Sequence, residues 1–208
     1  FKIKEKNKFY LIRSDIGSEK TIKKLIKDSI SILENIDGVV YSAYPRSEQW
    51  GKPLKNISLK YLNQDLSMQL GSAIYFSKEI LDYFQQNKGG SLIHISSIYG
   101  LRAPDFDLYK DTDIISPVEY SAIKSGIISI CKWFAKYYAN SNIRINCVSP
   151  GGIFDGHSKM FFNKYSEHCT NFGMISAEQV ASTISFLLSE KSAAINGENI
   201  VIDDGWSL

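Results

Sequence analysis

The side chains of this sequence that could do chemistry lie mainly in the pentapeptide from Tyr120 to Lys124. In a helix, a spacing of four residues places the phenol and the ammonium on one face. A free tyrosine, with a pKa of about 10, is a poor acid–base catalyst at neutral pH. A neighbouring ammonium favours the phenolate and lowers that pKa. If the Ser97 hydroxyl holds a carbonyl or alcohol oxygen nearby, the three side chains predict interconversion of an alcohol and a ketone.

The Tyr-x-x-x-Lys spacing is weak support on its own, because a chain with 12 tyrosines produces it by chance. The alternative is a solvated lysine beside a half-buried aromatic ring. The order of the surrounding elements therefore decides between the two interpretations.

Composition predicts a single domain over residues 1–208, with enough apolar sequence for a substantial core. A net charge of +2 gives no reason to expect a nucleic-acid partner. We expect no membrane span, because Lys124, Lys132 and Lys136 interrupt the longest apolar region.

The cysteines form no paired motif, which favours a reducing compartment and a cytoplasmic location over a disulfide framework. Cys131 and Cys147 stand in apolar sequence and are expected to be core thiols. His157, His168 and Cys169 lie near one another, but their spacing matches no zinc pattern, and we predict no metal site.

Short apolar runs alternate with longer amphipathic segments, which predicts a parallel sheet covered by helices on both faces. The predicted strands are 8–12, 38–43, 91–96, 143–148 and 199–203. The predicted helices are 18–35, 58–86, 116–138 and 176–188, with a short helix inside 155–173.

Two features frame the helix that carries Tyr120. Ser116 to Glu119 reads as a capping box with proline at the first helical position. The preceding segment, 97–115, is longer than most connections in compact domains, and we expect it to form a binding lid.

Five segments in the same order resemble the short-chain dehydrogenase/reductase family across essentially the whole chain. Each matches a family motif: an acidic residue after a strand, Ser-Ser-x-x-Gly, Tyr-x-x-x-Lys, a nicotinamide-lining segment and a closing strand. In this sequence they are Asp15-Ile16, Ser96 to Gly100, Tyr120 to Lys124, Ile143 to Ile153, and Asn196-Gly197 with Asp203 to Gly205.

The resemblance implies a three-layer, Rossmann-type doubly wound fold and an enzyme that uses NAD or NADP as its cofactor. Tyr120 becomes the general acid–base, Ser97 orients the substrate oxygen, and Lys124 holds the nicotinamide ribose. The family pairs its two long helices, which implies a homodimer or homotetramer. The further residues expected to contact the cofactor are Asp15, Ile16, Ser42, Ala43, Pro150, Gly151 and Ile153.

The family's Gly-rich phosphate-binding fingerprint does not occur among the 14 glycines. In the family's strand order, the first strand lies between the third and the fourth. The first strand visible in this sequence resembles the third. We therefore expect roughly forty to fifty further N-terminal residues in the native protein, to complete the sheet.

Two other positions depart from the family pattern. The usual Asn-Asn-Ala-Gly reads Tyr41-Ser42-Ala43-Tyr44, so a bulky ring replaces the glycine. Met68 stands where the family has a catalytic asparagine, and a methionine cannot hold the water that relays protons. Gln69 is a substitute if the helix register shifts.

Arg46 and Arg102 suggest recognition of a phosphate or carboxylate, although each arginine could instead bond loop carbonyls or solvent. Some segments resemble a subgroup found with genes for bacterial surface sugars, including flagellin-modifying nonulosonic acids. This resemblance implies a sugar or sugar-phosphate substrate. Two alternatives stay open: a non-catalytic nucleotide-binding or scaffolding member, and a 3-oxoacyl-carrier-protein reductase with a basic docking patch near its site.

Overall fold

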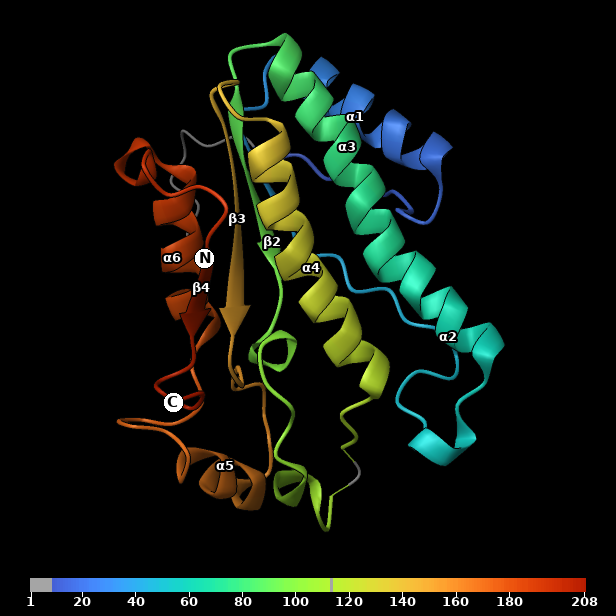
Figure 1. Cartoon of the computed structure of the whole chain (residues 1–208), viewed down its shortest axis with the longest axis vertical. Coiled ribbons are helices and arrows are strands. Elements are labelled where there is room, and N and C mark those ends of the chain that lie inside the picture. Colours follow the sequence, from blue (N-terminus) through green and yellow to red (C-terminus); the bar gives the residue numbers. More distant parts are fainter. Residues whose placement is uncertain (1–8, 113) are drawn as a thin grey trace.

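The computed structural model describes residues 9–112 and 114–208 and shows a sheet of four parallel strands. Their order is β1-β2-β3-β4, and each strand pairs in parallel with the next (Figure 1). The strands are β1 (Gly38–Tyr41), β2 (Gly90–Ile95), β3 (Ile143–Pro150) and β4 (Asn199–Ile202). The predicted parallel α/β fold is confirmed.

Helices cover both faces of this sheet, and their packing forms three layers (Figure 1). One face carries a large cluster of side chains from α1, α3 and α4, and the other a smaller cluster that includes α6. The helices are α1 (Glu19–Leu33), α2 (Leu59–Leu66), α3 (Ser72–Gln86), α4 (Val118–Tyr137), α5 (Lys159–Ser166) and α6 (Ala177–Leu188). None of the described helices has the length and apolarity that crossing a membrane requires.

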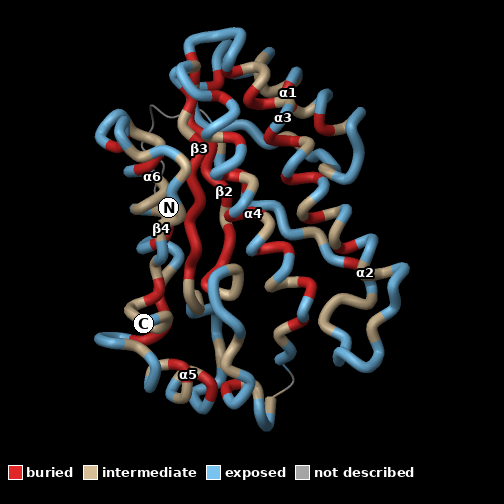
Figure 2. Tube along the Cα trace, viewed as in Figure 1, coloured by how far each residue is buried: buried red, intermediate tan, exposed pale blue. Residues whose placement is uncertain are grey.

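The most deeply buried backbone follows β2 and β3 (Figure 2). Leu92 joins the cluster under α3 and α4, whereas its neighbour Ile93 joins the cluster under α6. Successive side chains of a strand point to opposite faces, and a parallel sheet with helices on both faces buries both sets. This explains why the strand reads as a continuous apolar run in the sequence.

Three of the four predicted helix starts are confirmed, including Ser58 as the N-cap of α2, and one is wrong. Ser18 caps α1, and Ser176 forms a full capping box with Gln179 at the start of α6. The predicted box at Ser116 does not form, because α4 begins at Val118 with Pro117 as its N-cap. Ser116 therefore lies one position too early to cap the helix.

The predicted first strand is wrong. Lys8 lies outside the described residues, and residues 9–12 follow no strand geometry. Phe9 and Leu11 are 75% and 88% exposed. A strand needs a hydrogen-bonded neighbour, and in the described part of the sheet β1 pairs with β2 alone. In the family's strand order, residues 9–12 would not be adjacent to β1.

Candidate active site

Ser97, Tyr120 and Lys124 meet at the carboxyl end of the sheet. Ser97 follows β2 directly, while Tyr120 and Lys124 occupy the first two turns of α4. Ser97 and Tyr120 line the same cavity, and the Ser97 hydroxyl accepts from the backbone N–H of Tyr99 at 3.2 Å. The structure therefore brings together the three side chains that the sequence singled out.

The Ser-Ser-x-x-Gly segment, Ser96 to Gly100, fixes the distance between the end of β2 and helix α4. The short helix η3 (Ile98–Gly100) rests on α4, and a Cβ on Gly100 would lie 2.7 Å from the Lys124 carbonyl carbon. Ser125 donates to the Gly100 carbonyl at 2.6 Å, and Ser96 donates to the Lys124 carbonyl at 2.8 Å. Only glycine permits this approach, and the contact holds Ser97 beside Tyr120.

The Lys124 side chain is 7% exposed, and its ammonium donates to the Ile95 carbonyl at 3.0 Å. The nitrogen lies 5.5 Å from the ring centroids of both Tyr44 and Tyr120. Burial lowers the pKa of Lys124 to about 8, and the neighbouring Cys147 opposes this only in part. At neutral pH the ammonium still carries its charge.

The expected lowering of the Tyr120 pKa is not observed. Burial raises the pKa of Tyr120 above its ordinary value, and the hydrogen bond from Ser97 offsets this only in part. The Lys124 ammonium bonds the Ile95 carbonyl rather than the phenol. The desolvation of a buried phenolate therefore outweighs its attraction to the cation, and Tyr120 is held as a proton donor.

An aromatic cluster that the sequence reasoning missed covers the phenol. The Tyr44 ring lies edge-on to Trp50 at 5.5 Å and to Tyr120 at 5.8 Å, and Trp50 lies 6.3 Å from Tyr120. One indication of this aromatic cluster was present in the sequence, because Tyr44 stands where the family has glycine. Only the fold showed that this ring lies over the catalytic pair.

A cavity of about 190 Å³ opens next to the Tyr120 phenol, and Ser97 is one of the residues that line it. Tyr99 and Tyr109 line it and share a hydrogen bond of 2.6 Å between their hydroxyls. The remaining lining residues are Ile98, Ile114, Gly151, Gly152, Ile153, His157, Phe161, Tyr165 and Met174. Five residues of the predicted lid, 97–115, therefore border the cavity, and the other described residues of that segment do not.

The predicted cofactor residues fall into three places. Gly151 and Ile153 line the cavity, and Pro150 is the buried end of β3 just before them. Ser42 and Ala43 are exposed and follow β1. The remaining pair precedes α1: the carboxylate of Asp15 accepts from the Gly17 N–H at 2.9 Å, and Ile16 packs against the core.

The structure separates the two arginines. The Arg46 guanidinium lies 5.5 Å from the Tyr44 ring centroid, beside the catalytic cluster. Arg102 lines a second cavity of about 620 Å³ and donates to the Leu208 carbonyl at 3.3 Å. Tyr99 borders both cavities. Arg46 is therefore the arginine placed to meet a ligand of the catalytic cluster.

The long helix is irregular at the point where Met68 and Gln69 lie. A π-helical turn, η2 (Ser67–Gly71), separates α2 from α3. Such turns add one residue to a helix and are frequent at functional sites. Gln69 is 3% exposed and its Nε2 has no partner among the described residues, whereas Met68 accepts from Gln64 nearer the surface.

The two histidines considered for a metal site have different surroundings. His157 borders the cavity, and His168 pairs with Asp105 at 3.2 Å. Within residues 9–112 and 114–208, no group of three or more His, Cys, Asp or Glu side chains could hold a metal ion. The buried thiols of Cys131 and Cys147 are core residues, as expected.

Comparison with known proteins places this geometry in a family. A family model described as enoyl-(acyl carrier protein) reductase matches residues 2–207. Post-translational flagellin modification protein A of Campylobacter coli is 37% identical over 204 residues, which cover 98% of this chain and 80% of the relative. The 3-oxoacyl-[acyl-carrier-protein] reductase FabG of Aquifex aeolicus is 27% identical over 198 residues, 93% of this chain and 75% of the relative.

A solved structure shares the fold over the entire chain. It is a short-chain dehydrogenase from Leptospira borgpetersenii with bound NAD+, and it is 27% identical in sequence. The TM-score is 0.87, and the match covers 100% of this chain and 79% of the other.

Proposed function

Because the chain belongs to the short-chain dehydrogenase/reductase family, we propose that Ser97, Tyr120 and Lys124 carry out its NAD(P)-dependent interconversion of an alcohol and a ketone. The observation that supports this most directly is that Ser97 and Tyr120 line one cavity, with the Lys124 ammonium 5.5 Å from the centroid of the Tyr120 ring. A structural tyrosine has no need of both neighbours.

The residues around the phenol fit a nicotinamide nucleotide. The Lys124 ammonium has three donors, and the described residues give it one hydrogen-bond acceptor, the Ile95 carbonyl. The remaining donors suit the hydroxyl oxygens of a ribose. Gly151 and Ile153 share the cavity with Tyr120 and would hold the ring. The hydride for the reacting carbon is supplied or taken up by the nucleotide when it is bound.

The protein's own part is the proton. The Ser97 hydroxyl positions the substrate oxygen, and Tyr120, whose pKa is raised by burial, donates a proton to that oxygen as a ketone is reduced. Lys124 stabilises the phenolate that forms. In the oxidation direction the same phenol must first lose its proton, which the raised pKa disfavours at neutral pH.

The test is the pair Tyr120→Phe and Tyr44→Phe, each of which removes one phenol hydroxyl next to Lys124. We expect Y120F to lose roughly a hundredfold to ten-thousandfold in turnover and to keep the fluorescence change on binding NADH or NADPH. Y44F should retain turnover. Unchanged turnover in Y120F would refute the assigned role.

We extend the proposal to Gln69 as the residue that holds the water relaying protons between Lys124 and solvent, in place of the family's asparagine. Its support is the π-helical turn and the buried, unpartnered amide nitrogen described above. Gln69→Leu should slow turnover without weakening nucleotide binding. Met68→Leu should leave turnover unchanged. Equal rates in both variants would contradict this assignment.

For the substrate we propose a sugar or sugar phosphate used in surface-glycan biosynthesis. The relative from Campylobacter coli is a flagellin modification protein. Arg46 lies beside the catalytic cluster, where its guanidinium could pair with a phosphate or carboxylate. A panel of keto-sugars with and without an acidic group, assayed by NAD(P)H consumption, tests the substrate class.

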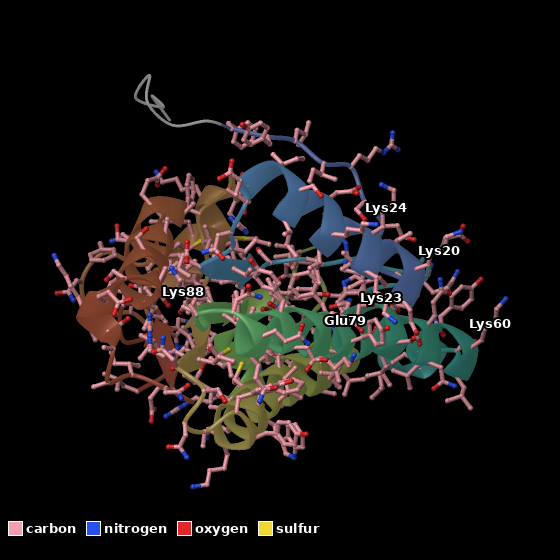
Figure 3. All side chains as sticks on the ribbon, turned by 90° about the horizontal axis from the view of Figure 1, so that it is seen from above. Lys20, Lys23, Lys24, Lys60, Glu79 and Lys88 are labelled. Carbon is pink, nitrogen blue, oxygen red and sulfur yellow. The ribbon has the colours of Figure 1, made fainter. Side chains whose placement is uncertain are left out.

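A 3-oxoacyl-carrier-protein reductase is the alternative that the relative from Aquifex aeolicus favours. It requires a basic patch at the site. Figure 3 shows Lys20, Lys23 and Lys24 on α1, where Lys23 faces Glu79 at 3.9 Å and Lys24 pairs with Asp28. Lysine is not among the described residues that line the catalytic cavity. Turnover of a 3-oxoacyl substrate and none of a keto-sugar would establish this alternative.

A non-catalytic, nucleotide-binding or scaffolding role is the second alternative. It predicts nucleotide binding without NAD(P)H consumption on any carbonyl substrate. The buried Lys124 beside Tyr120 argues against it, because a buried ammonium is costly.

The cellular setting and assembly complete the proposal. Free thiols, including the buried Cys131 and Cys147, suit a cytoplasmic enzyme. We propose a homodimer or homotetramer that forms through α4 and the helix pair α2 and α3. Trp133 and Tyr137 of α4 stack at 4.9 Å although they are 59% and 67% exposed. Light scattering should show an oligomer that Trp133→Glu dissociates.

A further inference from the structure

A row of polar side chains crosses the sheet beneath Lys124. Tyr41, His94 and Cys147 are register partners on β1, β2 and β3, so all three point to the same face. His94 is fully buried, and its ring centroid lies 5.3 Å from that of Tyr41. The residue after His94 is Ile95, whose carbonyl binds the Lys124 ammonium. The row therefore ends one residue before the carbonyl that binds the ammonium.

The hydrogen bonds of His94 determine which ring nitrogen carries the proton. Ser77 of α3 lies 2.8 Å from His94 Nε2 and gives its own proton to the Ala73 carbonyl at 2.7 Å. A serine hydroxyl has one proton, so Nε2 must be the donor. His94 is then a neutral Nε2–H ring, and Nδ1 keeps an unprotonated lone pair.

Two atoms of this row have no partner among the described residues. They are the His94 Nδ1 lone pair and the Tyr41 hydroxyl, both buried. Buried polar atoms are rarely left unpaired, because an unmade bond costs roughly 1–3 kcal/mol. Because the two rings are neighbours, an acceptor and a donor of this kind could share one bridging molecule, such as water.

We propose that His94 is a positioning residue that holds the Lys124 ammonium at the end of β2, through its neutral Nε2–H ring and the Nδ1 acceptor that it shares with Tyr41. This inference rests on the proposed role of Lys124. The groups that face the ammonium or His94 are Tyr41, Tyr44 and Tyr120, Cys147 of β3, and Ser77 of α3. Among these groups, Lys124 carries the only charge at neutral pH.

The electrostatics agree with this geometry. Burial, together with the charge of Lys124, lowers the pKa of His94 to about 3. The ring therefore stays neutral at physiological pH and does not compete with the ammonium. The Nδ1 lone pair adds negative potential to a poorly solvated interior, where such dipoles act strongly.

The first measurement needs no variant and no turnover. In a ¹⁵N-histidine spectrum, His94 should show the Nε2–H form and no titration between pH 5 and 9. His94→Gln identifies its signals among the three histidines of the chain. An Nδ1–H ring, or a ring that titrates near pH 6.5, would overturn the proposal.

The second measurement is the titration of Lys124, followed through its ¹³Cε signal and assigned with Lys124→Arg. We expect His94→Leu to lower the titration midpoint by about one pH unit, because a neutral acceptor near a buried charge is lost. His94→Gln should restore most of the shift. Ile145→Val, at a fully buried position of the same core cluster, controls for loosened packing and should leave the midpoint in place.

Ser77→Ala keeps the test decisive if His94→Leu fails to fold. Without the serine acceptor, the Nδ1–H form should appear and the Lys124 midpoint should fall. An unchanged midpoint in the folded variants would show that His94 only fills space. Because these readings do not involve catalysis, they stay separate from the test of the proposed function, which fails if Tyr120→Phe keeps full turnover.

Discussion

The Lys124 ammonium lies 5.5 Å from the centroid of the Tyr44 ring, as near as it lies to the ring of Tyr120. The buried ammonium therefore has two aromatic neighbours: Tyr44, in the segment that follows β1, and Tyr120, in its own helix α4. Tyr44 and Tyr120 also contact each other edge-on at 5.8 Å. This arrangement makes Tyr44 part of the environment that sets the charge of Lys124.

The rate of ketone reduction should fall as the pH rises through about 8. The pKa of Lys124 is lowered to about 8, so the charged form exists below that pH and is lost above it. Tyr120 remains protonated throughout this range, because burial raises its pKa. A profile of kcat/KM from pH 6 to 10 measures the effect. A rate that stays level up to pH 9.5 would contradict the role of the ammonium.

Tyr44→Ala should move that alkaline limit upward by about one pH unit, because water would reach the ammonium. The fall of the Lys124 pKa from 10.5 to about 8 corresponds to about 3 kcal/mol. The cation–π contact that is lost is worth about 0.5–2 kcal/mol, so hydration outweighs it. Tyr44→Phe keeps the ring and should leave the limit in place. An equal shift in both variants would exclude burial by the ring as the cause.

Arg46→Gln should raise KM about tenfold for an acidic sugar substrate, the loss expected for one charge-assisted hydrogen bond. Arg102→Gln removes the same charge from the other cavity and should leave KM unchanged. A neutral keto-sugar should be insensitive to both substitutions. If the two variants behave alike, the predicted anion recognition by Arg46 is wrong.

Asp204 anchors the segment between α5 and the catalytic cavity. Its carboxylate accepts from the backbone N–H groups of Asn171, Phe172 and Gly173 at 3.1, 2.7 and 2.8 Å. Burial tends to raise the pKa of Asp204, but these donors outweigh it and hold the pKa at about 2. The anchor is therefore charged at every working pH.

Asp204→Ala should release this segment, raise KM up to about tenfold and change kcat less, because Met174 beyond it lines the cavity. Hydrogen exchange of residues 170–174 should become faster. Glu167→Gln removes a charge from the exposed C-cap of α5 and serves as the matched control. Unchanged exchange in the Asp204 variant would show that the segment is held by other contacts.

Local signals predicted most of the elements. Ser18 and Ser176 mark helix starts because a side-chain oxygen bonds a backbone N–H three residues away, a contact that the sequence alone specifies. The first predicted strand failed because pairing needs a distant partner, which no local pattern reveals. The end of β3 was placed too early for the same reason, since Ser149 and Pro150 continue to pair with β4.

The sequence by itself predicted the candidate catalytic set, because Ser97, Tyr120 and Lys124 are recognisable by residue type and spacing. Only the tertiary structure decided the charge state of these side chains and which residues surround them. The pKa of Tyr120 depends on burial and on whether the ammonium faces the phenol or the Ile95 carbonyl. Tyr44, from the segment after β1, lies 5.5 Å from the Lys124 ammonium, a proximity that only the folded sheet creates. Desolvation and through-space charge depend on three-dimensional neighbours, and a sequence records only the order along the chain.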